Sequence, residues 1–291
     1  MNKYSAPNSE HMIRLRGSQA KAEKLRALHH GSPILVLANV WDAVSARIVE
    51  ESGATAIATT SAGIANMLGY ADGQNIPAKE MLWMVQRIAS SVCVPVTADL
   101  EAGYATTPAD MAAITEGLLE SGAVGLNLED HHPHEEELVE LSLQVEKIVA
   151  VLRTGKKYGV PLVVNARTDV FMPGIRKLAE PLKEAIQRAN AYRAAGADCI
   201  FVPGVTEMPV IRQLLAGSPG PLNVLATPTS PSAHELEAAG VRRVSIGSGA
   251  HRATVGFHRR FVTQVIQGDS FHLLGEDTLS YAELNRLFGN N

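Results

Sequence analysis

Two carboxylates follow an apolar segment in the stretch PVTADLEAGY, residues 95–104. The apolar part reads as a buried strand, and Asp99 and Glu101 stand at its end, two residues apart. Side chains two apart on a strand point to the same side, so these carboxylates converge if the strand geometry persists to Glu101. A third acid, Glu129, ends the following apolar strand in VGLNLED. The pattern predicts three carboxylates at a similar height on neighbouring strand ends.

Three crowded carboxylates repel one another and resist full ionisation, and a bound divalent cation removes this repulsion. A ligand set made of oxygen alone, without His or Cys, favours Mg²⁺, with Mn²⁺ as the second choice. We therefore predict a metal site formed by Asp99, Glu101 and Glu129. The alternative for each acid is that it caps the next helix or pairs with an arginine.

Two further segments could bind an acidic substrate. Arg167, in NARTD, presents a planar fork that matches a carboxylate. It could instead form an internal ion pair with Asp169 or Glu129, and the two roles are compatible. The segment TTSAGIA, residues 59–65, places hydroxyls and small residues where backbone N–H groups can approach an anion. The alternative for this segment is a simple tight turn.

The loop EDHHPHEEELVE, residues 129–140, contains three histidines, among them His131. A proton donor on a mobile loop is favoured over a second, histidine-bound metal, because the loop is polar and lies beside an acidic helix start. The acids Glu135 to Glu137 suit a helix N-terminus, so we expect the helix to run over 135–157.

The elements that position these residues are short apolar strands alternating with helices. Gly commonly follows the predicted helix ends, as in ESGATAI, ESGAVGL and AAGADCI, which is typical of helix C-caps that lead into buried strands. Eight such units predict a (β/α)₈ TIM-type barrel, with chemistry at the C-terminal strand ends. An open doubly wound sheet is the alternative, but the Gly-rich fingerprint is missing. The predicted strands are 34–40, 56–60, 95–100, 124–130, 162–169, 199–204, 222–226 and 243–248. The predicted helices are 42–51, 78–91, 108–121, 135–157, 177–194, 206–216, 231–238 and 250–266.

Composition narrows the function class. The chain has 291 residues and a net charge of −4, without a Lys/Arg block, which argues against nucleic-acid binding. It has neither a signal-peptide pattern at its start nor an apolar run of about 18 residues, and we expect no membrane contact. Cys93 and Cys199 lack metal-like spacing, which fits a reducing cytoplasm. We expect one domain over 1–291, with a core at about 30–260, a helix at 17–30 that closes the barrel bottom, and a helical tail at 250–291.

The segments TTSAGIANMLGYADG, ADLEAGY, NLED and NARTD, in this order, resemble the isocitrate lyase/phosphoenolpyruvate mutase superfamily. The resemblance covers roughly residues 30–260 and is closest to the small bacterial members. It implies a Mg²⁺-dependent enzyme that makes or breaks C–C or C–P bonds next to an oxyanion or enolate of a small 2-oxo acid. It also implies a barrel whose last helix is swapped between subunits, which gives dimers and tetramers.

The resemblance assigns roles to individual residues. It implies that Asp99 binds the metal most directly, while Glu101 and Glu129 act through water or at longer range. The substrate carboxylate is expected on the turn of Ser61, Ala62 and Gly63. The predicted catalytic residues are Arg167, Asp72 and His131, and the predicted substrate-binding residues are Ser61, Ala62, Gly63, Asp99, Arg167 and Asn223.

The chain also departs from the superfamily pattern. The loop after residues 124–130 lacks the K-[KR]-C-G-H motif of the lyases and the lysines of the mutases, and Pro203 and Gly204 stand where relatives have a His-Ser pair or a Glu. Ala105 replaces the usual glycine after Tyr104. The half of the site that binds metal and enolate is therefore retained, whereas the half that selects the leaving group is not recognisable.

We therefore predict a Mg²⁺-dependent carbon–carbon bond lyase or hydrolase acting on a small 2-oxo or 2-hydroxy di- or tricarboxylate through a metal-stabilised enolate. The alternatives are a C–P mutase or hydrolase and a non-catalytic metabolite-binding relative. The expected partners are the small carboxylate substrate and further copies of the chain, as a homodimer or homotetramer.

Overall fold

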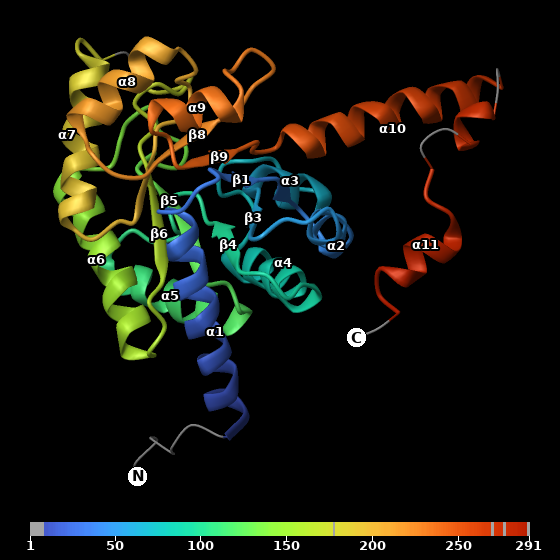
Figure 1. Cartoon of the computed structure of the whole chain (residues 1–291), viewed down its shortest axis with the longest axis horizontal. Coiled ribbons are helices and arrows are strands. Elements are labelled where there is room, and N and C mark those ends of the chain that lie inside the picture. The colour runs from blue at the N-terminus through green and yellow to red at the C-terminus, as the bar shows by residue number, and fades with distance from the viewer. Residues whose placement is uncertain (1–8, 177, 269–270, 276–277, 290–291) are drawn as a thin grey trace.

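The computed structural model describes residues 9–176, 178–268, 271–275 and 278–289, and its centre is a parallel sheet curled into a nearly closed barrel (Figure 1). Every neighbouring pair of strands is parallel, and the order is β1-β9-β8-β7-β6-β5-β4-β3-β2. The predicted barrel class is confirmed. The strands are β1 (Leu35–Leu37), β2 (Asn39–Val40), β3 (Ile57–Thr59), β4 (Val96–Asp99), β5 (Gly125–Glu129), β6 (Val163–Arg167), β7 (Cys199–Phe201), β8 (Leu222–Leu225) and β9 (Arg243–Ser245).

The first predicted strand, 34–40, is split at the barrel seam. Its first part, β1, pairs with β9, and its second part, β2, pairs with β3. The side chain of Asn39 joins the two sides, because its amide donates to Thr59 O at 2.8 Å while its Oδ1 accepts the N–H groups of Ile246 and Gly247 at 3.0 and 2.9 Å. The nine strands are therefore the eight predicted ones with one interrupted.

The helices surround the barrel (Figure 1). Local sequence begins several of them: Asp42 and Ser232 each form a capping box with the residue three positions later. The helices are α1 (Ser9–Leu28), α2 (Ala43–Glu51), α3 (Ser61–Met67), α4 (Ala78–Ser91), α5 (Pro108–Ser121), α6 (Leu141–Lys157), α7 (Pro181–Ala194), α8 (Met208–Gly217), α9 (Ala233–Ala239), α10 (Gly249–Gln267) and α11 (Tyr281–Arg286), with a 3₁₀ turn at His272–Gly275.

The helix predicted over 135–157 begins later, at Leu141. The acidic residues before it do not form a helical turn, because the segment folds back on itself. His131 and Leu138 form an antiparallel bridge, and the N–H of His132 donates to Glu137 O at 3.0 Å. The prediction that Glu135 to Glu137 start the helix is wrong, and these acids lie in the loop above the barrel.

Two other helix starts differ clearly from prediction, and one helix is additional. The helix predicted at 17–30 is longer at its start and runs over Ser9–Leu28. The helix predicted over 177–194 is α7, which begins at Pro181, because proline disfavours a helical conformation in the residue before it. Its predicted first residue, 177, lies outside the described residues. The short helix α3 was not expected, because its sequence is rich in small residues.

The barrel core is apolar between strands and helices but polar along the barrel axis. Buried asparagines and one arginine, Arg243, come from neighbouring strands. The Nη2 of Arg243 donates to Asn127 Oδ1 at 3.1 Å, and burial lowers the pKa of this arginine to about 10. Below it, burial and the Arg243 charge lower the pKa of His29 to about 3, so this histidine is neutral at pH 7. Polar groups thus continue from the barrel floor to the strand ends.

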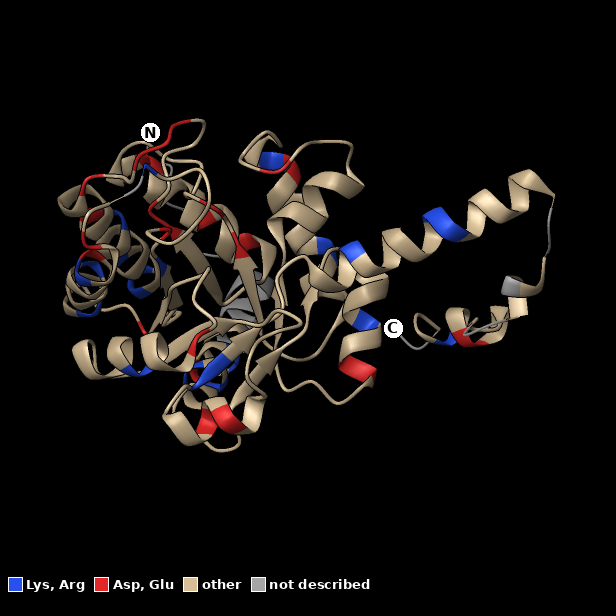
Figure 2. Ribbon diagram, turned by 90° about the horizontal axis from the view of Figure 1, so that it is seen from above, with Lys and Arg blue, Asp and Glu red and all other residues tan. Residues whose placement is uncertain are grey.

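The C-terminal helix α10 projects away from the barrel (Figure 1). The end of α11 returns to the barrel, where Arg47 Nε donates to Leu287 O at 2.7 Å. Figure 2 shows acidic and basic residues interspersed over the outer helices of the barrel. None of the described helices is long and apolar enough to cross a membrane.

Candidate active site

The predicted site residues gather at the C-terminal ends of β4, β5 and β6. Asp99 ends β4 and is the Cα partner of Asn127 on β5. Glu129 ends β5 and is the Cα partner of Arg167, which ends β6. Parallel pairing therefore brings residues that are some 30 positions apart in sequence into adjacent places on one rim.

Asp99 is held by the start of α3. Its Oδ2 accepts the N–H of Ser61 at 3.0 Å and the hydroxyl of Ser61 at 2.8 Å. Its Oδ1 has a longer contact, 3.4 Å, with Asn127 Nδ2. Asp99 thus binds the start of α3, which precedes it in the chain, and does not cap the next helix, α5, whose N-cap is Thr107. Its Oδ1 keeps acceptor capacity toward the rim.

The segment of Ser61, Ala62 and Gly63 is the first turn of α3 and not an isolated turn as expected. A Cβ on Gly63 would lie 2.7 Å from Thr60 Cγ2 and 2.9 Å from Trp41 Cβ, so only glycine fits. Ser61 N–H donates to Asp99 and Gly63 N–H contacts Thr60 Oγ1 at 3.5 Å. Among the described residues, the N–H of Ala62 is left as the free donor of this turn.

Glu101 does not continue the strand. β4 ends at Asp99, and Glu101 has a left-handed backbone with φ of 52°, so the expectation of strand geometry is wrong. Its carboxylate accepts the N–H of Gln74 at 2.6 Å and the hydroxyl of Tyr104 at 3.2 Å. Burial, followed by the charges of Asp99 and Asp72, raises the pKa of Glu101 to about 7. The acids are therefore close enough to oppose one another's ionisation.

Glu129 and Arg167 belong to a largely buried chain of charges that continues to Asp169 and His131. Arg167 Nη1 lies 2.8 Å from Glu129 Oε2, and its Nε and Nη2 lie 2.5 and 2.8 Å from the two oxygens of Asp169. The predicted alternative of internal ion pairs is confirmed for both acids. Arg167 uses three of its five N–H donors in this way and keeps two.

The charges in this chain set its pKa values. Burial raises the pKa of Glu129 well above its usual range, although Arg167 opposes the shift. Burial would also raise the pKa of Asp169, but Arg167 and His131 outweigh burial and hold it below its usual range. The hydrogen bond to Asp169 raises the pKa of His131. Asp169 is thus the ionised member that both cations share.

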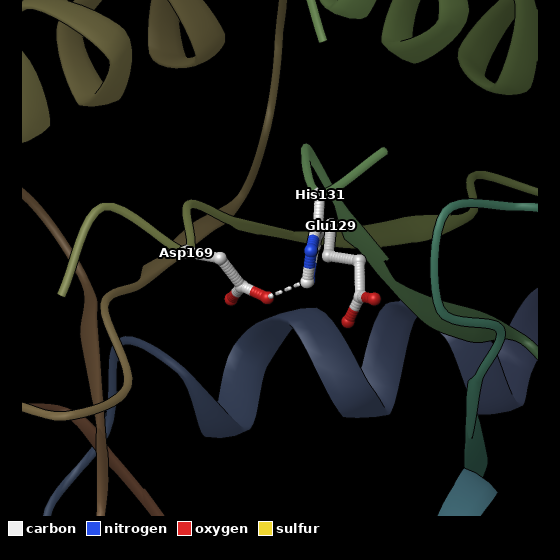
Figure 3. Close-up of side chains that lie close together, drawn as sticks. All are labelled: Glu129, His131 and Asp169. Atoms are coloured by element: carbon white, nitrogen blue, oxygen red, sulfur yellow. Dashed lines mark ion pairs between the residues drawn. The ribbon is translucent and has the colours of Figure 1, made fainter. Parts of the chain in front are cut away.

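Oxygen and nitrogen atoms of Glu129, His131 and Asp169 lie within 4.8 Å of one another, as a metal site would require (Figure 3). Arg167 already contacts both carboxylates, so a cation is present at this position. A second cation here would meet the guanidinium and protonated His131. The donor set therefore favours a metal on the other side of Glu129, towards Asp99 and Glu101.

His131 lies in the site, as predicted. Its Nδ1 is 3.5 Å from Asp169 Oδ2 and its Nε2 is 3.0 Å from Glu135 O. Because both ring nitrogens face acceptors, the doubly protonated ring is favoured. His131 is thus held between Asp169 and the backbone of its own loop.

Asp72 and Asn223 take different places. Asp72 lies on the loop between α3 and α4, and burial together with the Asp99 charge raises its pKa, so it belongs to the acidic rim. Asn223 is buried within β8, where its amide and Ser245 Oγ exchange hydrogen bonds of 3.2 and 3.3 Å. Asn223 has no hydrogen bond to the other predicted site residues in the described part of the chain.

Sequence reasoning missed two side chains of α6 that support the site. Gln144 Nε2 donates to Glu129 O at 3.0 Å, and Lys147 Nζ donates to Ala102 O at 2.6 Å. Both are buried, and burial lowers the pKa of Lys147 to about 8. The available signal was two polar residues three apart on the inner face of an amphipathic helix. They fix the backbone of the two acid-bearing segments.

Comparison with known proteins gives a family match over most of the chain. The profile of the family described as phosphoenolpyruvate phosphomutase matches residues 25–266. An uncharacterised protein of Mycobacterium tuberculosis is 34% identical over 78% of this chain and 82% of its own.

Two relatives with named activities also match. An oxaloacetate decarboxylase of Rhodopseudomonas palustris is 29% identical over 84% of this chain and 82% of its own. A 2,3-dimethylmalate lyase of Eubacterium barkeri is 28% identical over 67% of this chain and 68% of its own. A crystal structure of a 2,3-dimethylmalate lyase, 28% identical, covers 92% of this chain and 94% of its own with a TM-score of 0.79.

Proposed function

The chain belongs to the phosphoenolpyruvate mutase/isocitrate lyase superfamily, and from this premise we propose that it is a Mg²⁺-dependent carbon–carbon bond lyase or hydrolase. Its proposed substrate is a small 2-oxo or 2-hydroxy di- or tricarboxylate, cleaved through an enolate. The observation that carries the proposal is that four acids and one guanidinium come together on a single rim, where their charges act on the pKa values of Asp72, Glu101 and Glu129. These five residues are Asp72, Asp99, Glu101, Glu129 and Arg167.

The acids fit a magnesium ion. Asp99 and Glu101 offer carboxylate oxygens without His or Cys. The pKa of Glu101 is raised first by burial and then by the charges of Asp99 and Asp72, and a cation would offset the part due to these charges. Glu129 would act at longer range, since Arg167 shares its charge. Bound Mg²⁺ would supply Lewis-acid stabilisation of the negative charge that develops on the substrate oxygens.

The other residues would orient the substrate. The two unused N–H donors of Arg167 suit a substrate carboxylate, and contacts with Glu129 and Asp169 fix the plane of the guanidinium. The free N–H of Ala62 and the small residues beside it leave room for a second carboxylate. Such fixed donors lower the barrier because they need no reorganisation during the reaction.

Proton transfer is assigned to Asp72 and His131. For a 2-hydroxy acid, Asp72 would accept the hydroxyl proton, the C2–C3 bond would break, and C3 would keep the electron pair. His131 would then donate a proton to C3. The hydrogen bond to Asp169 raises the pKa of His131, which favours the protonated form that this step needs. Rotation of the imidazole away from the Glu135 carbonyl would free Nε2 for the task.

Carbon–carbon cleavage is favoured over carbon–phosphorus chemistry for two reasons. Arg167 and the uncharged α3 turn suit carboxylates better than a phosphonyl group. The relatives named as oxaloacetate decarboxylase and 2,3-dimethylmalate lyase are named for reactions at carbon–carbon bonds.

A substrate panel with Mg²⁺ tests the proposal. The protein is incubated separately with oxaloacetate, methylisocitrate, dimethylmalate and phosphonopyruvate, and the products are identified by NMR. We expect cleavage of at least one of the first three, lost on chelation of the metal. Turnover of phosphonopyruvate alone would transfer the assignment to C–P chemistry, and oxalate binding without turnover in a broad panel would indicate a non-catalytic relative.

A further inference from the structure

Three residues with left-handed backbones meet beside the acidic rim. The φ angles of Gln74, Glu101 and Tyr104 are 58°, 52° and 53°. In the described parts of the chain, His134 is the one other residue besides glycines with positive φ. Such conformations are uncommon outside glycine and persist where surrounding contacts hold them. Three such residues in one place indicate that contacts within the fold hold these backbones in a conformation that they would otherwise rarely adopt.

The three residues hold one another in a closed ring of hydrogen bonds. Gln74 N–H donates to Glu101 Oε2 at 2.6 Å, and Tyr104 N–H donates to Gln74 Oε1 at 2.7 Å. The Tyr104 hydroxyl donates to Glu101 Oε1 at 3.2 Å. Each Glu101 oxygen therefore has one donor, and the direction of the carboxylate is fixed from both sides.

The ring also joins two separate loops. Gln74 lies on the loop between α3 and α4, two residues after Asp72, whereas Glu101 and Tyr104 lie on the loop between β4 and α5. Gln74 takes part in two of the three contacts, as a backbone donor to Glu101 and as a side-chain acceptor from Tyr104. A substitution that removes only its side chain would therefore break the contact with Tyr104 and leave the backbone contact with Glu101.

We propose that Gln74 is a positioning residue that ties the loop carrying Asp72 to Glu101, so that metal binding and closure of this loop are coupled. The inference rests on the proposed function, because it takes Asp99 and Glu101 as the metal site. When a metal fixes Glu101, the ring holds the Asp72 loop against the rim. When the ring is open, Glu101 is free to rotate and the metal is bound less tightly.

The test uses Gln74→Gly, which keeps the left-handed backbone and its N–H but removes the acceptor for Tyr104. The matched control is His134→Gly, which relieves the same backbone conformation on another, exposed loop. Amide hydrogen exchange over residues 69–75 and at Tyr104 is measured with and without Mg²⁺, and the Mg²⁺ dissociation constant is measured by calorimetry without substrate.

We expect the Tyr104 amide of metal-free Gln74→Gly to exchange about tenfold faster than in the wild type, because it has lost its acceptor. Mg²⁺ should slow exchange over 69–75 in the wild type and in His134→Gly but not in Gln74→Gly, whose dissociation constant should rise about tenfold.

Equal exchange in the metal-free wild type and Gln74→Gly would overturn the ring as a tie between the loops. Wild-type binding of Mg²⁺ with an unchanged dissociation constant in Gln74→Gly would overturn the coupling while leaving the proposed function intact. Absence of Mg²⁺ binding by the wild type would overturn the proposed function and the coupling together, and the metal-free exchange would still decide whether Gln74 ties the loops.

Discussion

Glu129 and Arg167 face each other as Cα partners across β5 and β6, and their side chains form an ion pair of 2.8 Å. Asp169 and His131 continue this pair, so two basic side chains, Arg167 and His131, already lie beside the two carboxyl groups. A further cation among these four side chains would meet the Arg167 guanidinium. The unbalanced charge of the rim lies instead on Asp99 and Glu101, which is why we place the metal there.

The first prediction concerns Arg167→Lys. Lysine keeps the charge but not the planar fork, so it cannot contact Glu129 and Asp169 while also orienting a substrate carboxylate. We expect kcat/KM on the cleaved substrate to fall at least about 100-fold and the free energy of unfolding to fall by about 1–3 kcal/mol, since a buried acid loses its partner. Turnover assays and urea unfolding measure the two effects.

The control for this change is Arg26→Lys. Arg26 pairs with Asp198 at 2.6 Å at the opposite end of the barrel, and it is partly exposed. The Arg26→Lys substitution should leave kcat/KM unchanged. If Arg167→Lys also kept its kcat/KM, the guanidinium would have no role in substrate binding and the assignment of Arg167 would be wrong.

The second prediction concerns pH and Glu101. Its pKa is about 7 in the folded, metal-free protein against 4.5 in the unfolded chain, so the folded state binds the extra proton between these values. The free energy of unfolding should therefore fall as pH rises from 4.5 to 7, and level off above. Metal binding displaces this proton, so the apparent Mg²⁺ affinity should rise with pH up to about 7.

Glu101→Gln separates these effects. It keeps an acceptor for Gln74 N–H but cannot ionise. Without metal, we expect the free energy of unfolding of the variant at pH 8 to exceed that of the wild type by about 2 kcal/mol. With Mg²⁺ added, we expect the variant to lack the rise in melting temperature that the wild type shows. Melting curves at several pH values measure both. An unchanged response to Mg²⁺ would remove Glu101 from the metal site.

Much of the fold could be predicted because its signals are local. The strand that ends in Asp99 is buried throughout, and glycines such as Gly122 take the left-handed C-cap conformation that their place after a helix predicts. The split of the first strand at Ala38 and the late start of α6 at Leu141 could not be predicted, because they depend on pairing with distant segments.

The site was predictable only in part for the same reason. Polar residues at strand ends identified Asp99 and Arg167, because the barrel topology fixes where strand ends lie. The roles of Asp169, Gln74 and Lys147 depend on which loop meets which, and their sequence neighbourhood is ordinary. Glu101 was assigned to the correct rim for the wrong geometric reason, since it reaches the rim from a left-handed turn.

The third prediction concerns His131→Gln. Because the pKa of His131 is raised, its protonated form is complete below the unfolded value of 6.5 and is lost as pH rises through the folded value. Activity that needs its proton should fall on the alkaline side, and the variant should lose that limb together with about 100-fold or more in kcat.

The matched control is His132→Gln on the same loop, where His132 pairs with Glu135 at 3.5 Å and lies outside the buried charge group. It should retain both kcat and the alkaline limb. A His131→Gln enzyme with a wild-type pH profile would show that another group supplies the proton.

The fourth prediction concerns the assembly. Nine of the fourteen large apolar residues that are exposed in the described chain lie between Val255 and Phe288, on α10, on α11, between these helices and just after α11. Ile266 is 82% exposed and Tyr281 is 85% exposed, which is unfavourable for a single copy in water. We expect this tail to pack on a second copy, as the superfamily resemblance implies, and the protein to be a homodimer or homotetramer.

Light scattering after size exclusion should give a multiple of the 31.1 kDa chain mass. Ile266→Glu should shift it to the monomer, whereas Val36→Lys, at an exposed apolar residue of β1, should not. A wild-type chain that is monomeric at micromolar concentration would contradict the expected assembly.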